Sequence, residues 1–433
     1  MESRFCRHTY FMRFLLRHPL LATLAGLRGN ARACVYTEPM WGFSMNLCLP
    51  YLSVFMITLG LSDTQVGIVS SVYMTSQILF SFLSGALTDK FGRRKSVAVF
   101  DAIGWSIPCI VWFFAVDFKF FLVAAIFNGA MRVPMTAFNC LIIEDTDKSK
   151  ITHIYTLIMI CGSLSALLSP ITSQLISMYT LIPAIRILLV NAFVVMTTKI
   201  FLLYFISRET SIGKARLIET KKQSYASILG GYFKVLGNMR GSRGLIFAIT
   251  IASLFTIISS TNSTFWQIIV SRKLEISDKD LPIFTMIRAI ISLFFYFTVI
   301  TRIRQTKLKN PLLTGFAAYF TGQLILLLIP SAGAIRYVLL CVSLVCDGLG
   351  AGILVMLSEA MVAIHAGENE RASVLAINQM IIMAICAPFG WIAGMLSNMS
   401  RSLPFILNLL LICAGVIITL IHFRSEANYA PSE

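Results

Sequence analysis

Ionisable side chains lie inside several long apolar stretches of this sequence, where an unpaired charge is costly. Glu38 opens the run Glu38-Pro39-Met40-Trp41, six residues past Arg32. A buried carboxylate can take up a proton or a small cation, and the proline interrupts the helical hydrogen bonding beside it. Glu38 is therefore the first candidate for an ion-coupling site. The alternative is that it forms an ion pair with a basic residue.

Three further charges occupy apolar runs and could bind a charged solute. Arg132 lies in the middle of one run, where its guanidinium group could hold an anionic substrate or pair with Glu38. Arg288 and Asp347 lie in two later runs and form a second possible pair. Each is a functional candidate because charges inside a membrane are expensive.

Uncharged polar and aromatic side chains in the same runs could complete a binding site. Trp41 and Trp266 could stack on a substrate, whereas amide side chains could hydrogen-bond to it. The amide candidates are Asn46, Asn139, Asn262, Gln267, Asn378 and Gln379. The alternative for the amides is a hydrogen bond between helices, and for the tryptophans a place at the membrane interface.

Motifs of other chemistries are missing from the sequence. It has no Walker loop, no nucleophile motif and no His/Cys pattern with metal-ligand spacing. The 5 histidines are scattered, and the 10 cysteines form no CxxC pair. We therefore expect no enzyme activity, no ATP-driven transport, no metal site and no cofactor.

Long apolar helices must position these residues. Of the 433 residues 57% are apolar and only 13% are charged, whereas soluble domains carry about 25% charge. A helix spans a bilayer with roughly 20 apolar residues. Runs of about that length cover 33–58, 64–87, 96–116, 119–143, 152–177, 181–206, 244–270, 282–301, 311–329, 336–363, 372–396 and 402–423. This pattern predicts an all-α polytopic membrane protein with twelve transmembrane helices.

Basic residues are concentrated in alternate connections between these runs. Of the 36 Lys and Arg residues, 26 lie on the side that holds both termini, 6 lie on the other side and 4 lie within the runs. Since cytoplasmic loops are rich in Lys and Arg, both termini are expected in the cytoplasm, with the plasma membrane as the location. The net charge of +16 thus indicates topology and attraction to membrane lipids rather than nucleic-acid binding.

The chain divides into two halves around its longest polar connection. Segment 207–243 holds 8 basic residues and separates six runs from six. L-G-L-S-D-T-Q-V-G-I at 59–68 resembles L-E-I-S-D-K-D-L-P-I at 274–283, and each follows the first run of its half. Ser62 and Ser277 stand where the next helix needs a cap. Such a pseudo-repeat predicts a transporter with its substrate site between two six-helix halves.

The resulting organisation has five parts. A basic N-terminal segment (1–32), containing a short interfacial helix, precedes the first six-helix half (33–206). A basic cytoplasmic linker (207–243) leads to the second half (244–423), and a cytoplasmic tail (424–433) follows.

The connection between the second and third runs carries a recognisable motif. Residues 85–95 read G-A-L-T-D-K-F-G-R-R-K. This pattern resembles the signature Gly-x-Leu-x-Asp-Arg-x-Gly-Arg-Lys/Arg of the major facilitator superfamily, with Lys90 in place of the usual arginine. Topology alone would need only the cations, so Gly85, Asp89 and Gly92 indicate a further role.

The resemblance extends over nearly the whole chain and implies two halves that rock around a central site. It implies that the motif forms a conformational gate, a cytoplasmic contact favouring the outward-open state. Asp89 can accept hydrogen bonds at a helix N-terminus, and the arginines can pair with carboxylates or carbonyls at helix ends. The expected gate residues are Gly85, Asp89, Gly92, Arg93, Arg94, Glu144 and Glu359.

The same resemblance selects among the intramembrane charges. It places the first, fourth, seventh and tenth helices around the cavity, which favours Glu38, Arg132 and Asp347. Charges on helices that usually lie outside the cavity are interpreted as packing pairs within one half, namely Asp101, Arg186 and Lys199.

Motifs of the drug-antiporter subfamily are only partly present. Serines at 165, 169 and 173 replace the glycines expected around Pro170, and the helix 4 motif keeps only Arg132. We therefore expect a secondary active transporter of a small solute, coupled to a proton or Na+ gradient and acting as a monomer. The alternatives are an exporter of amphipathic drugs or lipids, and a transporter-like receptor that does not transport.

Overall fold

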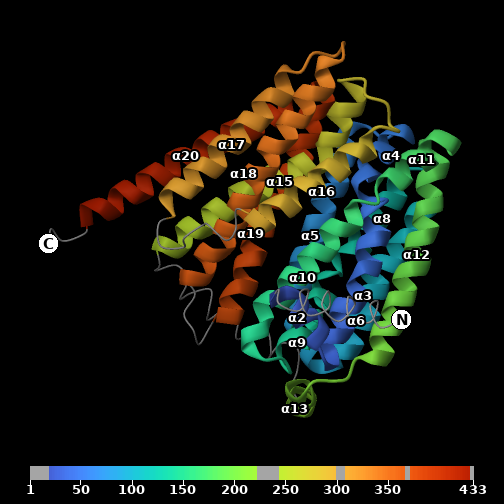
Figure 1. Ribbon diagram of the computed structural model, residues 1–433, viewed down its shortest axis with the longest axis vertical. Coiled ribbons are helices and arrows are strands. Elements are labelled where there is room, and N and C mark those ends of the chain that lie inside the picture. The colour runs from blue at the N-terminus through green and yellow to red at the C-terminus, as the bar shows by residue number, and fades with distance from the viewer. Residues whose placement is uncertain (1–18, 222–242, 299–307, 366–370, 430–433) are drawn as a thin grey trace, which may run out of the picture.

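Every regular element that the structure describes is helical. The computed structural model describes residues 19–221, 243–298, 308–365 and 371–429. The prediction of an all-α protein is confirmed, and Figure 1 shows the helices gathered into one bundle. Parts of the predicted N-terminal segment, linker and tail lie outside the described residues.

The first half contains six long helical segments, several of them made of two or three consecutive helices. The first combines α3 (Gly29–Asn46), the 3-10 turn η1 (Leu49–Tyr51) and α4 (Leu52–Thr58). The others are α5 (Asp63–Phe91), α6 (Arg93–Asp101) with the π-helical turn η2 (Ala102–Ser106) and α7 (Ile107–Phe113), α8 (Phe118–Gly129) with α9 (Arg132–Ile143), α10 (Lys148–Ala166) with α11 (Pro170–Tyr179), and α12 (Leu181–Ile206). Two short helices lie before and after them, α2 (Pro19–Gly26) and α13 (Ser211–Thr220).

The second half is built from longer uninterrupted helices. They are α15 (Arg243–Arg272), α16 (Leu281–Thr298), α17 (Lys309–Leu328), α18 (Ile335–His365), α19 (Arg371–Met399) and α20 (Leu403–Tyr429). Within the described residues, 11 helical segments are long and apolar enough to cross a membrane. The eighth predicted run, 282–301, corresponds to α16, whose apolar part, Leu281–Phe295, is shorter.

The two copies of the repeat segment start their helices differently. Ser62 caps α5, because its Oγ accepts a hydrogen bond from Gln65 N (3.2 Å) while Gln65 Oε1 accepts one from Ser62 N (2.9 Å). The capping prediction is confirmed for this copy. It is wrong for the second copy, where Ser277 O accepts from Asp280 N in a turn and α16 begins only at Leu281.

Prolines affect the helices according to their position. α3 continues through Pro39, and the chain departs from the α-helix only near Pro50, which lies in η1. The break expected at Pro39 is therefore displaced by about two turns, to the end of α3 at Asn46. Pro170 is the first residue of α11, where the missing N–H removes no helical hydrogen bond.

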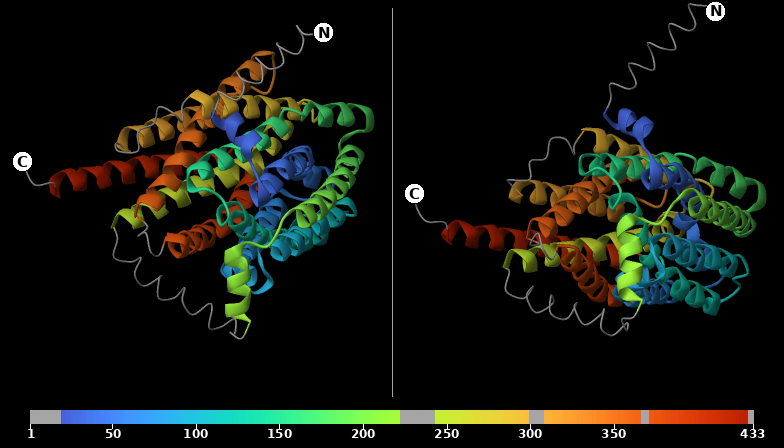
Figure 2. Two further views of the ribbon diagram at one scale, coloured as in Figure 1. Left: turned by 60° about the horizontal axis from the view of Figure 1, so that its bottom comes forward. Right: turned by 90° about the horizontal axis from the view of Figure 1, so that it is seen from below.

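The halves diverge from one end of the bundle to the other. We call the end that carries α13 the linker end and the other the opposite end. In Figure 1 the first-half helices run nearly vertically, whereas α15 and α17–α20 slant from the top to the lower left, away from α13 at the bottom. Figure 2 shows α13 and the end of α20 projecting from the bundle.

Polar contacts between the halves gather at the opposite end. Tyr51 Oη donates to Thr285 Oγ1 (3.0 Å). Ser397 Oγ donates to Asp63 Oδ2 (2.6 Å), which also lies 3.4 Å from Arg401 Nε. Because Asp63 is buried, these two partners offset the cost of its charge.

Glycines let α5 and α19 pack closely at the same end. A Cβ on Gly67 would collide with the Gly390 carbonyl oxygen and would lie 2.7 Å from the Gly394 Cα. Small residues on facing helices permit such backbone approach in membrane proteins. These contacts hold α5 and α19 together at the opposite end.

Adding one methyl group at Gly67 should loosen the opposite end. Gly67→Ala must displace α19 backbone, and overpacking costs about 1–3 kcal/mol. We expect a melting temperature several degrees lower in detergent and a longer α5–α19 distance between spin labels. The control is Gly162→Ala, because a Cβ there meets nothing within 4 Å. Equal effects of the two substitutions would show that close glycine packing does not hold this end together.

Candidate substrate cavity and gate

A cavity of about 360 Å³ lies between the two halves. It brings together several predicted residues, with Trp41 and Asn46 on α3 facing Trp266, Gln267 and Arg288 on α15 and α16. Its remaining lining residues are Pro50, Gly162, Ser163, Ala166, Ser263, Thr285, Ala289 and Ser292. Both halves therefore contribute to one small, partly polar space.

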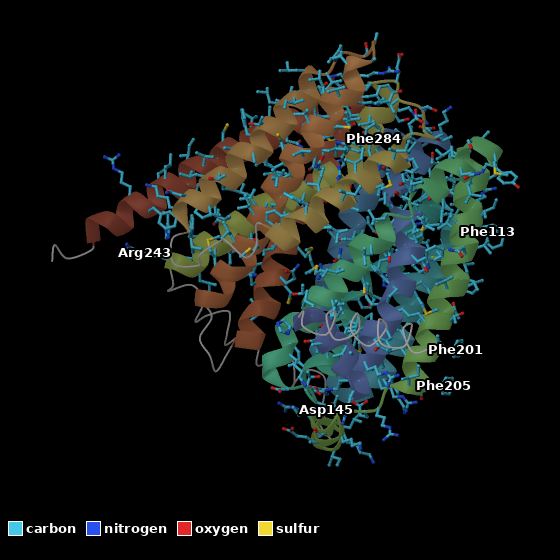
Figure 3. The ribbon with its side chains drawn as sticks, viewed as in Figure 1. Phe113, Asp145, Phe201, Phe205, Arg243 and Phe284 are labelled. Carbon is cyan, nitrogen blue, oxygen red and sulfur yellow. The ribbon has the colours of Figure 1, made fainter. Side chains whose placement is uncertain are left out.

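Buried polar atoms at this cavity lack hydrogen-bond partners within the described residues. They are Arg288 Nη2, Trp266 Nε1 and Gln267 Oε1. The guanidinium carbon of Arg288 lies 4.9 Å from the Trp266 ring centroid, so the two side chains stack. Phe284, labelled in Figure 3, packs edge-on against Trp266 with a centroid distance of 6.1 Å. Two hydrogen-bond donors and one acceptor at this cavity are therefore unpaired within the described residues.

Asp347 belongs to an adjacent cavity of about 250 Å³ that Arg288 also lines. The carboxylate is 4% exposed and accepts two hydrogen bonds from Gln323 Nε2, at 2.9 and 3.1 Å. Asn262 Nδ2 lies 3.4 Å from Asp347 Oδ2 and from Tyr319 Oη. The described residues contain no ion pair between Asp347 and Arg288, although both face this cavity.

Small and polar residues around Asp347 were not singled out by the sequence. A Cβ on Gly322 would collide with Asp347 Oδ1, so α17 can approach the carboxylate only with glycine there. Gln323 is fully buried and also accepts a hydrogen bond from Asn408 Nδ2 (3.2 Å). Gln323 satisfied the criterion applied to the other amides, a polar residue in an apolar run, and could have been found in that way.

Glu38 pairs with Lys199 rather than reaching the cavity. Glu38 Oε2 lies 3.4 Å from Lys199 Nζ, where the Lys199 side chain is buried and the Glu38 side chain is 14% exposed. Asp101 lies near enough to interact electrostatically with both. Asp101 and Lys199, two of the residues assigned to packing, thus join Glu38 in one cluster of two carboxylates and one ammonium, whereas Arg186 donates to Ala115 O (3.2 Å). This arrangement corresponds to the ion-pair alternative for Glu38.

Arg132 lies apart from Glu38, in contact with both halves. Its Nε donates to Gln77 Oε1 (2.6 Å) on α5, and its Nη2 lies 3.8 Å from Met383 Sδ on α19. The possible Glu38–Arg132 pair does not form. Within the described residues no carboxylate pairs with Arg132, and it lines neither of the two cavities.

The remaining amide candidates divide between the cavities and the helix packing. Asn262 lines the Asp347 cavity, whereas Asn139 accepts a hydrogen bond from Tyr155 Oη (3.0 Å). Asn378 is buried with its Oδ1 unpaired in the described part of the chain. Neither Asn378 nor Gln379 is among the residues that line the two cavities.

At the linker end, Arg93 is the centre of the predicted gate cluster. It is 4% exposed and pairs with Asp89 (2.8 Å) and Glu144 (2.9 Å), while its Nε also donates to Glu144. Thr210 Oγ1 donates to the same glutamate. All of these residues belong to the first half or to the start of the linker.

Glu209 supplies the helix cap that Asp89 was expected to supply. Its two carboxylate oxygens accept from Arg93 N (3.0 Å) and Arg94 N (3.2 Å) at the start of α6. Gly92 precedes them with φ +82, a conformation that favours glycine. Asp89 accepts from the Arg93 side chain instead, so its capping role was predicted wrongly.

The remaining gate candidates are Arg94, Gly85 and Glu359. Arg94 Nε donates to Tyr204 O (2.6 Å), the carbonyl of a residue near the end of α12, and its guanidinium stacks on the Tyr204 ring. Gly85 lies within α5. The side chain of Glu359 lies outside the described residues.

The apolar helical segments, the two divergent halves and the cavity between them define an integral membrane transporter, not an enzyme. The sequence profile of the Major Facilitator Superfamily matches residues 40–390, and the chain belongs to this superfamily. The prediction from the 85–95 motif is thereby confirmed. No curated protein sequence matches the chain.

Solved transporters share the fold at low sequence identity. The nucleoside transporter NupG is 14% identical, with a TM-score of 0.69 over 92% of this chain and 99% of that chain. A POT family transporter in complex with a thioalcohol-conjugated peptide is 16% identical, with a TM-score of 0.69 over 92% and 96%. Another POT family structure holds 5-aminolevulinic acid, with a TM-score of 0.66 and 16% identity over 91% and 95%. Alternating access is typical of this fold.

The Glu38 cluster predicts unequal costs for removing its members. Lys199→Met leaves two buried carboxylates without their cation, and breaking such a pair costs about 3–5 kcal/mol. Glu38→Gln leaves Lys199 with Asp101 and should cost less, as should Asp101→Asn. Thermal unfolding in detergent measures all three. A Lys199→Met variant no less stable than the other two would contradict the proposed arrangement.

Loss of the Glu209 cap should loosen the start of α6. Glu209→Ala removes the acceptor of two backbone N–H groups, and losing a helix cap costs about 1 kcal/mol. We expect faster hydrogen exchange at the amides of Arg93 and Arg94. Glu219→Ala on α13 is the control, since Glu219 is exposed and pairs only with Arg216 in the described chain. Unchanged exchange in the Glu209 variant would rule out the cap.

Proposed function

We propose that the chain is a secondary active transporter that carries a small polar solute through the cavity between its halves. The observation that carries this proposal is a cavity lined by both halves in which buried polar atoms are unpaired. An unsatisfied buried donor or acceptor costs about 1–3 kcal/mol, and a ligand that pairs with it recovers this free energy. A site between two halves is also where rocking motion would expose it to each side in turn.

The lining atoms restrict the chemistry of the solute. Arg288 Nη2 and Trp266 Nε1 are donors, so the solute carries an acceptor group facing them, most favourably a carboxylate or another anionic group. Gln267 Oε1 faces a donor of the solute. Cavity volumes of about 360 and 250 Å³ suit a small molecule. The unpaired donors and acceptor in this partly polar lining favour a polar solute over the amphipathic drugs or lipids of the alternative.

Asp347 is the carboxylate best placed to couple transport to a proton or Na+ gradient. It lies in the cavity that Arg288 also lines, whereas Glu38 is engaged with Lys199. Binding of a cation at Asp347 would change the field that Arg288 and its anionic ligand experience. We place residues 33–206 and 244–423 as the two moving bodies of a monomer in the plasma membrane, with both termini cytoplasmic.

A thermal-shift screen tests the cavity as the substrate site. Purified protein is screened against small organic acids, peptides and nucleosides, since a ligand raises the melting temperature of the state it binds. For a ligand found in this way, Arg288→Gln should weaken binding about 10- to 150-fold, the loss of a charge-assisted hydrogen bond of about 1.5–3 kcal/mol. The control is Arg424→Gln, which removes an exposed charge far from the cavity.

Two outcomes distinguish binding of a ligand at this cavity from its transport across the membrane. Unchanged affinity in the Arg288 variant would place the ligand elsewhere. A ligand that binds through Arg288 but is not carried by proteoliposomes, with or without a proton or Na+ gradient, would support the receptor alternative.

A further inference from the structure

A further cavity lies at the linker end, apart from the two cavities described above. Its volume is about 710 Å³, and its walls come from the start of α3, the connection between α9 and α10, the end of α12 and the segment before α13. The lining residues are Arg28, Gly29, Asn30, Arg32, Ala33, Tyr36, Thr37, Asp145, Thr146, Ile206 and Arg208. We call it the basic groove.

The charge of the basic groove is strongly unbalanced. Arg28, Arg32 and Arg208 are all exposed, and within the described residues none of them pairs with a carboxylate. Asp145 is the acidic residue of the lining, and its Oδ1 already accepts a hydrogen bond from Ser211 Oγ (3.0 Å). The groove thus contains three guanidinium groups and one carboxylate, and this carboxylate already accepts a hydrogen bond. This arrangement suits an anion that offers several oxygen acceptors.

The groove is held in shape by its own hydrogen bonds. The buried Asn30 side chain accepts from Arg208 N (2.8 Å) and donates to Arg208 O (2.9 Å), which fixes the start of the linker against α3. The Arg32 guanidinium lies 5.4 Å from the Tyr36 ring centroid. The arginines are therefore brought together by tertiary structure across 180 residues of sequence rather than by a local basic run.

Exposed apolar side chains lie beside the basic groove. On α12 beside it, Phe205 is 71% and Ile206 57% exposed, and Tyr36 on α3 is 50% exposed. Figure 3 shows Phe201 and Phe205 on α12 at the outer edge of the bundle, with Asp145 close to the linker end. Apolar surface that remains exposed on a membrane protein is suited to acyl chains. A free phosphate ion would use the arginines but not this apolar wall.

We propose that the basic groove binds the phosphate headgroup of an anionic phospholipid, whose acyl chains lie along the apolar face of α12. The arginines surround the phosphate, and Ile206 and Tyr36 meet the upper part of the chains. Basic pockets between transmembrane helices on the cytoplasmic side are a recurrent solution for headgroup binding. The side predicted to be cytoplasmic from the Lys and Arg distribution is the side on which this groove opens.

Native mass spectrometry of the purified full-length protein tests the proposal. The protein is released from mixed micelles holding equal amounts of phosphatidylglycerol and phosphatidylcholine, and the bound lipids are counted. We expect wild type to retain phosphatidylglycerol preferentially. The triple variant Arg28→Gln, Arg32→Gln and Arg208→Gln should retain at least threefold less. The matched control removes three positive charges from α13 and the residue that follows it, at the same end, by Lys214→Gln, Arg216→Gln and Lys221→Gln, and should retain lipid as wild type does.

Two further measurements test the positioning of Arg208 and distinguish a lipid phosphate from a free phosphate ion. Asn30→Ala removes no charge but frees Arg208, so it should also lower phosphatidylglycerol retention. Inorganic phosphate is added as a competitor, and millimolar phosphate should not displace the lipid. Displacement by phosphate would point to a site for a free anion. Equal loss in the two triple variants would reduce the effect to net charge, and both results would overturn the proposal. If the triple variant fails to fold, the exposed single variants Arg28→Gln and Arg32→Gln are measured in its place.

Discussion

The cost of burying charged and polar groups in an apolar bundle constrains this structure more than any other factor. Lipid and packed apolar side chains offer these groups no water, so each must find a partner inside the protein or remain as a penalty. Lys199 is balanced by Glu38 and Asp101, and Arg93 at the linker end by two carboxylates. Such clusters fix how neighbouring helices are rotated against each other, because a small rotation would expose an unpaired charge.

Departures from full pairing then identify where a ligand can act. Gln323 donates hydrogen bonds to Asp347, and Asn408 donates one to Gln323. In the adjoining cavities, Arg288, Trp266 and Gln267 keep buried polar atoms without hydrogen-bond partners among the described residues. Unpaired buried atoms occur elsewhere in the described chain as well, but those of Arg288, Trp266 and Gln267 line a cavity to which both halves contribute. In the first half, by contrast, the charged cluster at Glu38 is self-contained. At this cavity the second half contributes Arg288, Trp266 and Gln267, and the first half contributes Trp41 and Asn46.

Features encoded by local pattern could be predicted from the sequence, and features decided by helix rotation could not. The spans follow from run length, and the family follows from the spacing of Gly85, Asp89 and Gly92. Which partner Glu38 takes depends on the face of α3 that meets α12, and no spacing rule within the sequence reveals that face. Glu209 was missed for a related reason. It caps α6 from 116 residues away, and nothing in its neighbourhood marks a residue with that role.

The position of Asp89 explains why the motif needs an aspartate and not only cations. Its side chain is 26% exposed, and within the described residues only Oδ1 is hydrogen-bonded, to Arg93. Glu144 and Glu209 hold the arginine and the start of α6 without its help, so Asp89 is the member of the cluster with acceptor capacity to spare. Within the described residues no group of the second half pairs with Asp89, and the contacts of Tyr51 and Asp63 with the second half lie toward the opposite end. A gate that closes the linker end would need such an acceptor on the first half. Asp89 is free to turn toward a new partner because the Arg93 guanidinium group would still be paired with Glu144.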